Sequence, residues 1–202
     1  KNIKCSRFSR IMSSSTSKQI LGQFITSLST KQPTPGGGAA AAIGGAIGGA
    51  AAQMAAAYTQ RKKDKESGAA AKADQLIASI DLEKYLQGAD DDAVAYMDLQ
   101  RTWKDSSMSP EEKKDIEMRA LAVPTNLLEM CHEDVMNISN FLPHCNPNIT
   151  SDAKVGIHQL AGAARAAFQT VMVNSPPDDE RIRLKGLLKE INKVEDEILD
   201  LE

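Results

Sequence analysis

The sequence stretch that decides the fold is PTPGGGAAAAIGGAIGGAAAQMAAA, which spans residues 33–57. Its last 19 residues comprise eleven Ala, four Gly, two Ile, one Met and one Gln, so bulky side chains are nearly absent. Alanine favours the helix, whereas each glycine inside a helix costs about 1 kcal/mol relative to alanine. The glycines between Gly44 and Gly49 form two pairs with a spacing of four residues, and therefore two smooth stripes along one helix. The pattern predicts a central helix whose neighbours pack almost against its backbone.

The residues before this helix predict a tight loop. Pro33 and Pro35 disfavour a helix there, and the glycines Gly36, Gly37 and Gly38 can adopt positive φ. A helix that begins after them presents unpaired N–H groups and the positive end of its dipole. Such a terminus suits a carboxylate, a phosphate or a developing oxyanion.

The same stretch has two other interpretations. An uncharged run of this length can span a bilayer, with the basic residues 61–63 as its cytoplasmic flank. Alanine and glycine are only weakly apolar, however, and the sequence offers no second span, so we do not expect a membrane protein. A buried central helix without chemistry of its own fits these residues as well as a binding site does.

Length and charge limit the classes of protein to consider. The 202 residues fit one domain, and a net charge of −3 argues against a general nucleic-acid binder. Aromatic residues make up 4% of the chain, too few for a base-stacking platform. No acidic residue precedes Asp64, and residues 1–17 are basic and rich in Ser. We interpret residues 1–17 as a disordered or non-native leader, with a mitochondrial transit peptide as the alternative, and residues 18–202 as one helical domain.

The cysteines indicate a reducing compartment. Cys5, Cys131 and Cys145 are odd in number and show no CxxC spacing, so we expect no disulfide framework. We therefore expect a cytoplasmic protein, or a mitochondrial one if the leader is a native transit peptide. Adjacent helical residues point about 100° apart, which disfavours zinc binding by the pairs Cys131-His132 and His144-Cys145.

Helix signals dominate the chain, and strand signals are missing. Beside the central helix, helices are predicted near Ile20 (with Ser17 as N-cap), Glu66, Ala93, Ser109, Ser151 and Asp179. Ser109 and Glu112 predict a capping box, and Pro124 predicts a bend within the helix that follows. From Leu184 to Leu201, apolar residues alternate spacings of three and four, which predicts a seam that packs on the body or on a second subunit. The predicted fold class is all-α.

Several segments match one known family in order and spacing. They are residues 33–38 with the small-residue helix, 59–63, 90–96, 101–104, 122–124, 146–156 and Asn174. In these segments the chain resembles the C-terminal family of formiminotransferase-cyclodeaminase, which includes cyclodeaminases and stand-alone methenyltetrahydrofolate cyclohydrolases. The resemblance implies an all-α orthogonal helical bundle around the central Gly/Ala-rich helix. It also implies a homodimer, with a folate pocket lined by the glycine loop near the subunit interface.

The resemblance implies chemistry on one-carbon forms of tetrahydrofolate. The expected reaction closes 5-formiminotetrahydrofolate to 5,10-methenyltetrahydrofolate with release of ammonia. One alternative is a methenyltetrahydrofolate cyclohydrolase, and the other is a non-catalytic folate-binding or helical interaction protein of the same fold. The family needs no metal or redox cofactor beyond tetrahydrofolate, which can be polyglutamylated, as substrate. We expect no nucleic-acid or membrane partner.

Two carboxylates are candidates for the proton transfers of this ring closure. One group must deprotonate N10 and one must protonate the leaving nitrogen, which carboxylates do well when burial raises their pKa. Among residues that match the family pattern we select Asp92 and Asp152 as catalytic. Asp152 fits equally well as the N-cap of the helix that begins near Ser151. Asp92 lies in the run 90–92, which a solvated acidic turn also explains.

The remaining candidates bind the substrate. The resemblance assigns this role to Gly36, Gly37 and Gly38. Folate is anionic at its glutamate tail, so the cations Lys62 and Lys104 are expected to contact it, although a charged run such as 61–65 is often only solvated. Asn148 is expected to hold the pterin or the formimino group, although Asn between prolines also suits a turn.

The chain also departs from the family pattern. Ala39 stands where a Ser is common after the glycines, and Lys65 stands where a Tyr is usual. The further departures are Gln60 and Arg61 for an apolar residue and Gly, Trp103 for Pro, Thr170 for Asn and Met172 for Arg. Because several of the replaced groups are polar, the fold is a firmer expectation than the activity.

Overall fold

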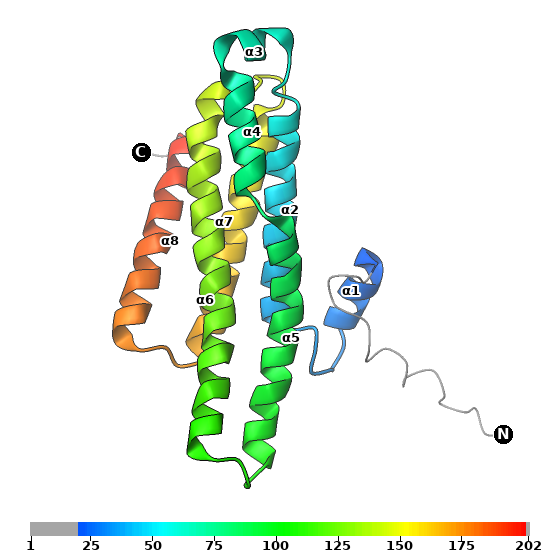
Figure 1. Cartoon of the computed structure of the whole chain (residues 1–202), viewed down its shortest axis with the longest axis vertical. Helices are drawn as coiled ribbons and strands as arrows, with labels where there is room; N and C mark the ends of the chain where they lie inside the picture. Colours follow the sequence, from blue (N-terminus) through cyan, green and yellow to red (C-terminus); the bar gives the residue numbers. More distant parts are fainter. Residues whose placement is uncertain (1–19, 201–202) are drawn as a thin grey trace, which may run out of the picture.

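The computed structural model describes residues 20–200, and the described part contains only helices, turns and loops (Figure 1). The helices are α1 (Leu21–Leu28), α2 (Gly37–Ala57), α3 (Lys62–Ser67), α4 (Ala69–Ser79), α5 (Leu82–Lys104), α6 (Pro110–Phe141), the 3₁₀ turn η2 (Leu142–His144), α7 (Thr150–Val173) and α8 (Asp178–Ile198). The all-α fold class is confirmed. The leader 1–17 and the expected N-cap Ser17 lie outside the described residues.

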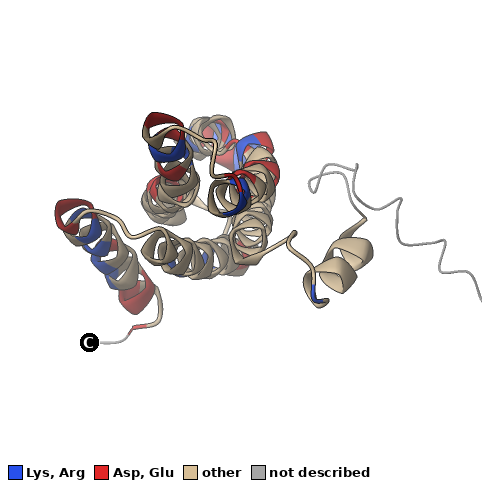
Figure 2. Cartoon of the chain, turned by 90° about the horizontal axis from the view of Figure 1, so that it is seen from below, with Lys and Arg blue, Asp and Glu red and all other residues tan. Residues whose placement is uncertain are grey.

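The long helices run side by side along the longest axis of the molecule, and α1 stands to one side of them (Figure 1). Seen end-on in Figure 2, the helices surround a common core, and α8 at the left edge carries charged residues along its length. In contrast, α2 contains no charged residue over its 21 positions.

The two glycine stripes of α2 let neighbouring helices approach its backbone, as the spacing predicted, and each stripe faces a different helix. A Cβ added to Gly48 would lie 2.9 Å from Cγ of Leu160 and 3.0 Å from the carbonyl oxygen of Gly156 in α7. A Cβ on Gly45 would lie 2.6 Å from the ring of Tyr85 in α5. In return, a Cβ on Gly156 would lie 2.8 Å from the carbonyl oxygen of Gly48. The glycines therefore offset their poor helix propensity by allowing α7 and α5 to approach the backbone of α2.

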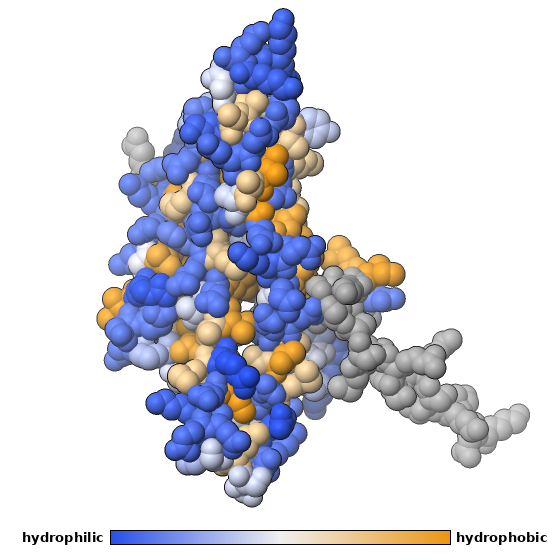
Figure 3. All heavy atoms as spheres, viewed as in Figure 1, coloured by the Kyte–Doolittle hydropathy of each residue, from blue (hydrophilic) through white to orange (hydrophobic). Residues whose placement is uncertain are grey.

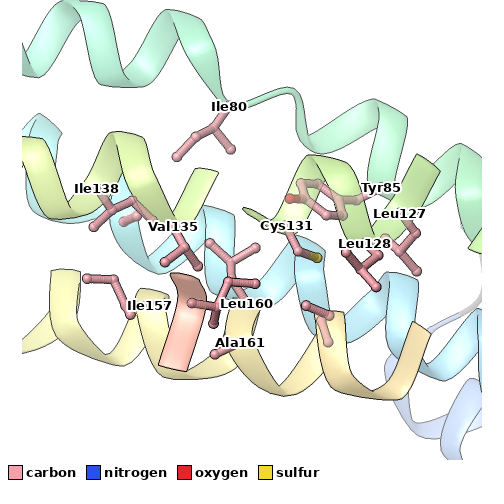
Figure 4. Close-up of a cluster of buried hydrophobic side chains, with 14 of the residues drawn as sticks. Ile80, Tyr85, Leu127, Leu128, Cys131, Val135, Ile138, Ile157, Leu160 and Ala161 are labelled. Atoms are coloured by element: carbon pink, nitrogen blue, oxygen red, sulfur yellow. The ribbon is translucent and has the colours of Figure 1, made fainter. Parts of the chain in front are cut away.

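The core fills the space that these helices leave. Figure 4 shows Leu128, Cys131, Val135 and Ile138 of α6 pointing toward residues of α7 such as Leu160, and these residues are fully buried. The hydroxyl of Tyr85, also fully buried, donates a hydrogen bond to Oδ2 of Asp134 at 2.7 Å. Burial raises the pKa of Asp134 to about 6, and this hydrogen bond opposes the rise.

Several helix boundaries differ from expectation. The helix predicted from Glu66 is divided into α3 and α4, because Gly68 adopts a left-handed conformation with φ of 81°. The segment predicted near Ala93 belongs to the long helix α5, whose start is capped by Asp81 accepting from the N–H of Lys84 at 3.2 Å. The capping box of α6 is confirmed, and α6 continues through Pro124.

The start of α7 corrects one expectation. Neither Ser151 nor Asp152 caps this helix: it begins at Thr150, and the flanking residue Ile149 makes no side-chain cap. The N–H of Ile149 donates to the carbonyl of Asn146 at 2.9 Å, and this turn starts the helix early. Asp152 lies in the first turn of α7, where it accepts from the Ser151 hydroxyl at 3.3 Å.

Helix α8 packs on the body of the same chain. Its residues Leu184, Ile191 and Val194 are buried with the core residues of the other helices. At the margin of this contact, Glu195 accepts hydrogen bonds from His158 and Arg165 of α7. The apolar residues of α8 were expected to pack either on the rest of the chain or on a second subunit, and in the described residues they pack on the rest of the chain. Leu201 lies outside the described residues.

Candidate functional site

The glycine loop meets a carboxylate from another helix. The backbone N–H of Ala39, in the first turn of α2, donates to Oδ2 of Asp92 at 3.0 Å. A Cβ on Gly38 would overlap Oδ1 of the same carboxylate, so no other residue fits there while Asp92 keeps its position. A side chain of α5 therefore occupies the N-terminus of α2, as expected for a terminus that attracts an anion.

Gly36, Gly37 and Gly38 do not adopt the positive φ that glycine permits. Gly36 is the N-cap residue with an extended backbone (φ −117°, ψ −165°), and Gly37 and Gly38 already belong to α2. Within the described residues, Gly68 is the glycine with positive φ. These glycines therefore do not use the positive φ that glycine allows, and Gly38 instead provides space for the Asp92 carboxylate.

Burial and a hydrogen bond act on the Asp92 carboxyl in opposite directions. It lies inside α5 and is partly buried, so the solvated acidic turn considered for residues 90–92 is not formed. Burial raises the pKa of Asp92, and the hydrogen bond from the N–H of Ala39 opposes this rise. A raised pKa makes a carboxylate a stronger base.

Asp92 lines a cavity of about 490 Å³ between α5, α6 and the end of α7. The lining residues are Asp92, Ala95, Tyr96, Leu99, Trp103, Glu117, Ala120, Thr170, Val173, Asn174 and Ser175. They combine apolar and aromatic surface with a few polar groups, the usual composition of a small-molecule site. Among the substrate-binding candidates, Lys104 follows Trp103 directly at the exposed end of α5.

One wall of the cavity depends on a hydrogen bond that replaces a missing backbone donor. Pro124 has no N–H, so the carbonyl of Ala120, four residues earlier in α6, lacks its helical partner. The side-chain amide of Asn174 donates to this carbonyl at 3.0 Å and to the carbonyl of Thr170 at 3.2 Å. This bond fastens the end of α7 to α6 beside the cavity.

At the other end of α2, a hydrogen-bond network lies beside the candidate residues Lys62 and Asn148. Arg61 donates to Asn146 through Nη1 at 2.5 Å and to Asp64 through Nε at 2.7 Å. The Arg61 hydrogen bond holds the pKa of Asp64 below its usual range. Oδ1 of Asn146 also accepts from the backbone N–H of Asn148 at 3.1 Å. This network joins the start of α3 to the loop before α7.

The predicted site residues are thus divided within one protomer. The side chain of Lys62 is 92% exposed and lies 3.9 Å from Glu66, while Asn148 is also exposed and Asp152 partly buried. Asp152 lies about 25 Å along α2 from Asp92, given 1.5 Å per helical residue and the antiparallel contacts of α2 with α7. The structure therefore brings together Gly36, Gly38 and Asp92, but not Asp92 and Asp152.

The sequence analysis did not identify several residues that line the Asp92 cavity or form the Arg61 network. Tyr96, Glu117 and Asn174 were not proposed as cavity residues, and Trp103 was noted only as a departure from the family. Trp103 is the one Trp of the chain and follows Tyr96 by seven residues, two helical turns on one face, which was an available signal. The bridge from Arg61 to Asn146 spans 85 residues and had no local signal.

No group of three or more His, Cys, Asp or Glu side chains in residues 20–200 is arranged to hold a metal. Cys131 and Cys145 are buried in the core, and His132 is hydrogen-bonded to Glu190 at 2.7 Å. Helix α2 is long and apolar enough to cross a membrane, but 56% of the relevant window is buried inside the bundle. The central helix of a water-soluble bundle passes the same test, so this feature is weak evidence for a membrane span.

Comparisons with known proteins agree with this architecture. A family model described as formiminotransferase-cyclodeaminase matches residues 20–193. The crystal structure of formiminotetrahydrofolate cyclodeaminase from Thermotoga maritima superimposes with a TM-score of 0.78 at 19% sequence identity, covering 91% of this chain and 96% of that chain. At this identity the structural match shows the fold. No curated protein matches the chain significantly in the sequence search. Since the family model spans most of its length, the chain belongs to the formiminotransferase-cyclodeaminase family.

Proposed function

We propose that the protein is a formiminotetrahydrofolate cyclodeaminase that uses the cavity beside Asp92. The observation that carries this proposal is the Asp92 carboxyl, which has a raised pKa, is held by the N–H of Ala39 and lines the cavity. Family membership supports the folate-related activity, and the Thermotoga maritima protein of the same fold is named for this reaction.

The proposed reaction needs proton transfer at two nitrogens. N10 bonds to the formimino carbon, and the bond from this carbon to its terminal nitrogen breaks. The proton of N10 passes to the terminal nitrogen, a further proton comes from solvent, and ammonia leaves a cationic methenyl product. Asp92 is suited to take the N10 proton, because a raised pKa makes its carboxylate a stronger base, and Asp152 is the candidate that protonates the leaving nitrogen. Lys104, at the exposed end of α5, is suited to contact the anionic glutamate tail.

We further propose that the protein acts as a homodimer formed through the outer face of α2. Ile47, Met54 and Tyr58 on this face are 48%, 41% and 62% exposed, and no charge interrupts the helix. In Figure 3, orange surface follows the edge of the bundle where α2 lies. An uncharged, exposed helix face of this length suits a subunit interface.

In such a dimer, Asp92 of one subunit would lie near the candidate residues at the other end of α2 in the partner subunit. A twofold axis perpendicular to α2 near Ile47 makes the two α2 helices antiparallel. Gly38 of one protomer then lies level with Ala56 of the other, because the two positions are equally distant from Ile47. Asp92 would face the end of the partner subunit that carries Lys62, Asn148 and Asp152. This arrangement gives Asp152 access to the same substrate.

Subunit exchange tests this composite site. Asp92→Asn and Asp152→Asn proteins are each expected to be inactive as homodimers. After random exchange about half of the dimers are mixed, and each mixed dimer has one unaltered site, so about a quarter of wild-type activity returns. Light scattering of the wild type monitors the dimer. A monomer in light scattering, or no recovery despite confirmed exchange, would refute the composite site.

The activity itself is tested by following the methenyl chromophore with the purified protein. With 5-formiminotetrahydrofolate, we expect methenyl formation and equimolar ammonia release above the buffer rate. Faster decay of 5,10-methenyltetrahydrofolate without turnover of the formimino substrate would identify a cyclohydrolase. A folded protein that binds folate but turns over neither compound would be a non-catalytic member of the family.

A further inference from the structure

The mouth of the Asp92 cavity carries an exposed aromatic pair. Trp103, in the last turn of α5, is 67% exposed, and Tyr96, two turns earlier on the same face, is 38% exposed. Their ring centroids lie 6.5 Å apart, and the ring planes meet at 84°. Both residues line the cavity with Asp92. Tryptophan is on average a highly buried residue, since its indole carries a large apolar area.

The geometry of the pair leaves aromatic surface available for a ligand. A T-shaped contact uses the edge of one ring and one face of the other, so three of the four ring faces are not consumed by it. The contact also restricts the orientation of Trp103, which lowers the entropy lost when a ligand ring stacks on it. A flat, uncharged or cationic ring system is the partner that such faces favour.

The charged residues of the cavity restrict which kind of ligand ring can bind there. Its charged lining residues in the described part are Asp92 and Glu117, and both are acidic. Carboxylates accept hydrogen bonds from ring N–H and amino groups and repel anionic rings. The cation nearest in sequence to the aromatic pair is Lys104, which lies outside the lining and next to Trp103. The chemistry therefore suits a heteroaromatic ring with N–H donors inside the cavity.

We propose that Trp103 and Tyr96 form the stacking surface for the amino-pteridine ring of the substrate, and that Glu117 accepts hydrogen bonds from the N–H edge of that ring. The choice of a pteridine rests on the proposed folate activity, whereas the aromatic surface and its acidic neighbour are features of this chain. Trp103 and Glu117 are then specificity residues, and Asp92 retains the proton transfer.

The single Trp makes the proposal testable without turnover. Trp fluorescence of the wild type is titrated with 5-formyltetrahydrofolate, a stable reduced folate, and with p-aminobenzoylglutamate, which has the tail but no pteridine. Free N-acetyltryptophanamide corrects for absorption by the ligands. We expect saturable quenching by the folate and at least about tenfold weaker binding of p-aminobenzoylglutamate, since a stacked base typically contributes 1–3 kcal/mol. Equal quenching by both ligands would overturn the assignment of the pteridine to Trp103.

Variants separate stacking from structural support. Calorimetry is expected to give a Kd for 5-formyltetrahydrofolate about tenfold or more higher for Trp103→Leu, and within about threefold of wild type for Trp103→Phe, which keeps a ring. Glu117→Gln is expected to raise Kd several-fold through loss of the charged acceptor. In turnover assays, Trp103→Leu should raise KM with little change in kcat.

The outcomes distinguish this inference from the proposed function. Binding of 5-formyltetrahydrofolate that Trp103→Leu weakens about tenfold, in a protein without turnover, would support the stacking surface and refute the cyclodeaminase proposal. Turnover with an unchanged KM in Trp103→Leu would refute the stacking surface and leave the cyclodeaminase proposal intact.

Discussion

The carboxylate of Asp92 accepts the backbone N–H of Ala39 at 3.0 Å, so a side chain from the middle of α5 caps the first turn of α2. The same carboxylate lines the cavity between α5, α6 and α7. A single group thus connects the small-residue helix that organises the bundle with the candidate site. The α2 N-terminus stabilises the charged form of Asp92, whereas burial raises its pKa.

Replacement of Gly38 by Ala is expected to displace this carboxylate. The new Cβ would overlap Oδ1 of Asp92, so the side chain must move and the bond to the N–H of Ala39 is lost. We expect turnover to fall by about a hundredfold and stability to fall by about 1 kcal/mol, the usual value of a helix cap. Gly37→Ala is the matched control for folding, because its Cβ meets nothing within 4 Å. Unchanged unfolding and turnover in Gly38→Ala would show that Asp92 does not need this position.

Removal of the Asn174 side-chain amide is expected to lower the free energy of unfolding substantially only when residue 124 is Pro. Asn174→Ala leaves the Ala120 carbonyl without a donor, which costs about 1–2 kcal/mol. In a Pro124→Ala background, the new backbone N–H of residue 124 can donate to that carbonyl, and the cost of Asn174→Ala should fall below about 0.5 kcal/mol. A double-mutant cycle from urea unfolding measures this coupling. Additive effects would mean that the Asn174 bond does not replace the missing donor.

The buried Asp134 predicts a stability that depends on pH. Its pKa in the folded protein is about 6, above the ordinary value of 3.8. Because the folded state favours the protonated form, the contribution of Asp134 is fully present below about pH 4 and is lost as pH rises through about 6. The pKa difference corresponds to about 3 kcal/mol. Asp134→Asn, which keeps an acceptor for the Tyr85 hydroxyl, should therefore stabilise the protein at pH 8 and not at pH 4. Equal destabilisation at both pH values in urea unfolding would contradict this.

The crossing of α2 and α7 predicts opposite effects for two glycines of one helix. Gly156→Ala places a Cβ 2.8 Å from the carbonyl oxygen of Gly48, a backbone atom that cannot move aside, so we expect a loss of about 2–4 kcal/mol. Gly162→Ala meets nothing within 4 Å and should gain up to about 1 kcal/mol from helix propensity. Thermal unfolding of both proteins gives the answer. A stable Gly156→Ala protein would show that the helices are not in close contact.

Much of the fold was predictable because it depends on local patterns. The spacing from Gly44 to Gly49 predicted the close helix contacts, and Ser109 with Glu112 predicted the start of α6. The division at Gly68 was missed because a single glycine inside a helical pattern does not reveal its own φ. The start of α7 was misplaced because the residue before the helix, Ile149, caps it without a side-chain hydrogen bond, whereas the sequence offered Ser151 and Asp152 as conventional caps.

The candidate site was less predictable because its contacts join residues far apart in the chain. Asp92 and Ala39 are 53 residues apart, and Asn174 and Ala120 are 54 residues apart. Such contacts depend on the order and register of the helices, which periodicity does not specify. The family resemblance selected Asp92, but only the structure shows that Gly38 makes room for it and that Asp152 lies at the opposite end of α2.

The most direct test of the central claim compares wild type with Asp92→Asn in the conversion of 5-formiminotetrahydrofolate. Asn is isosteric and keeps an oxygen that can accept from the N–H of Ala39, so folding should be preserved, as circular dichroism and unfolding can verify. We predict methenyl formation and ammonia release by the wild type, and a rate about 10²- to 10⁴-fold lower for Asp92→Asn, the range typical of a lost acid–base group. A folded Asp92→Asn protein that forms methenyltetrahydrofolate at the wild-type rate would contradict the account.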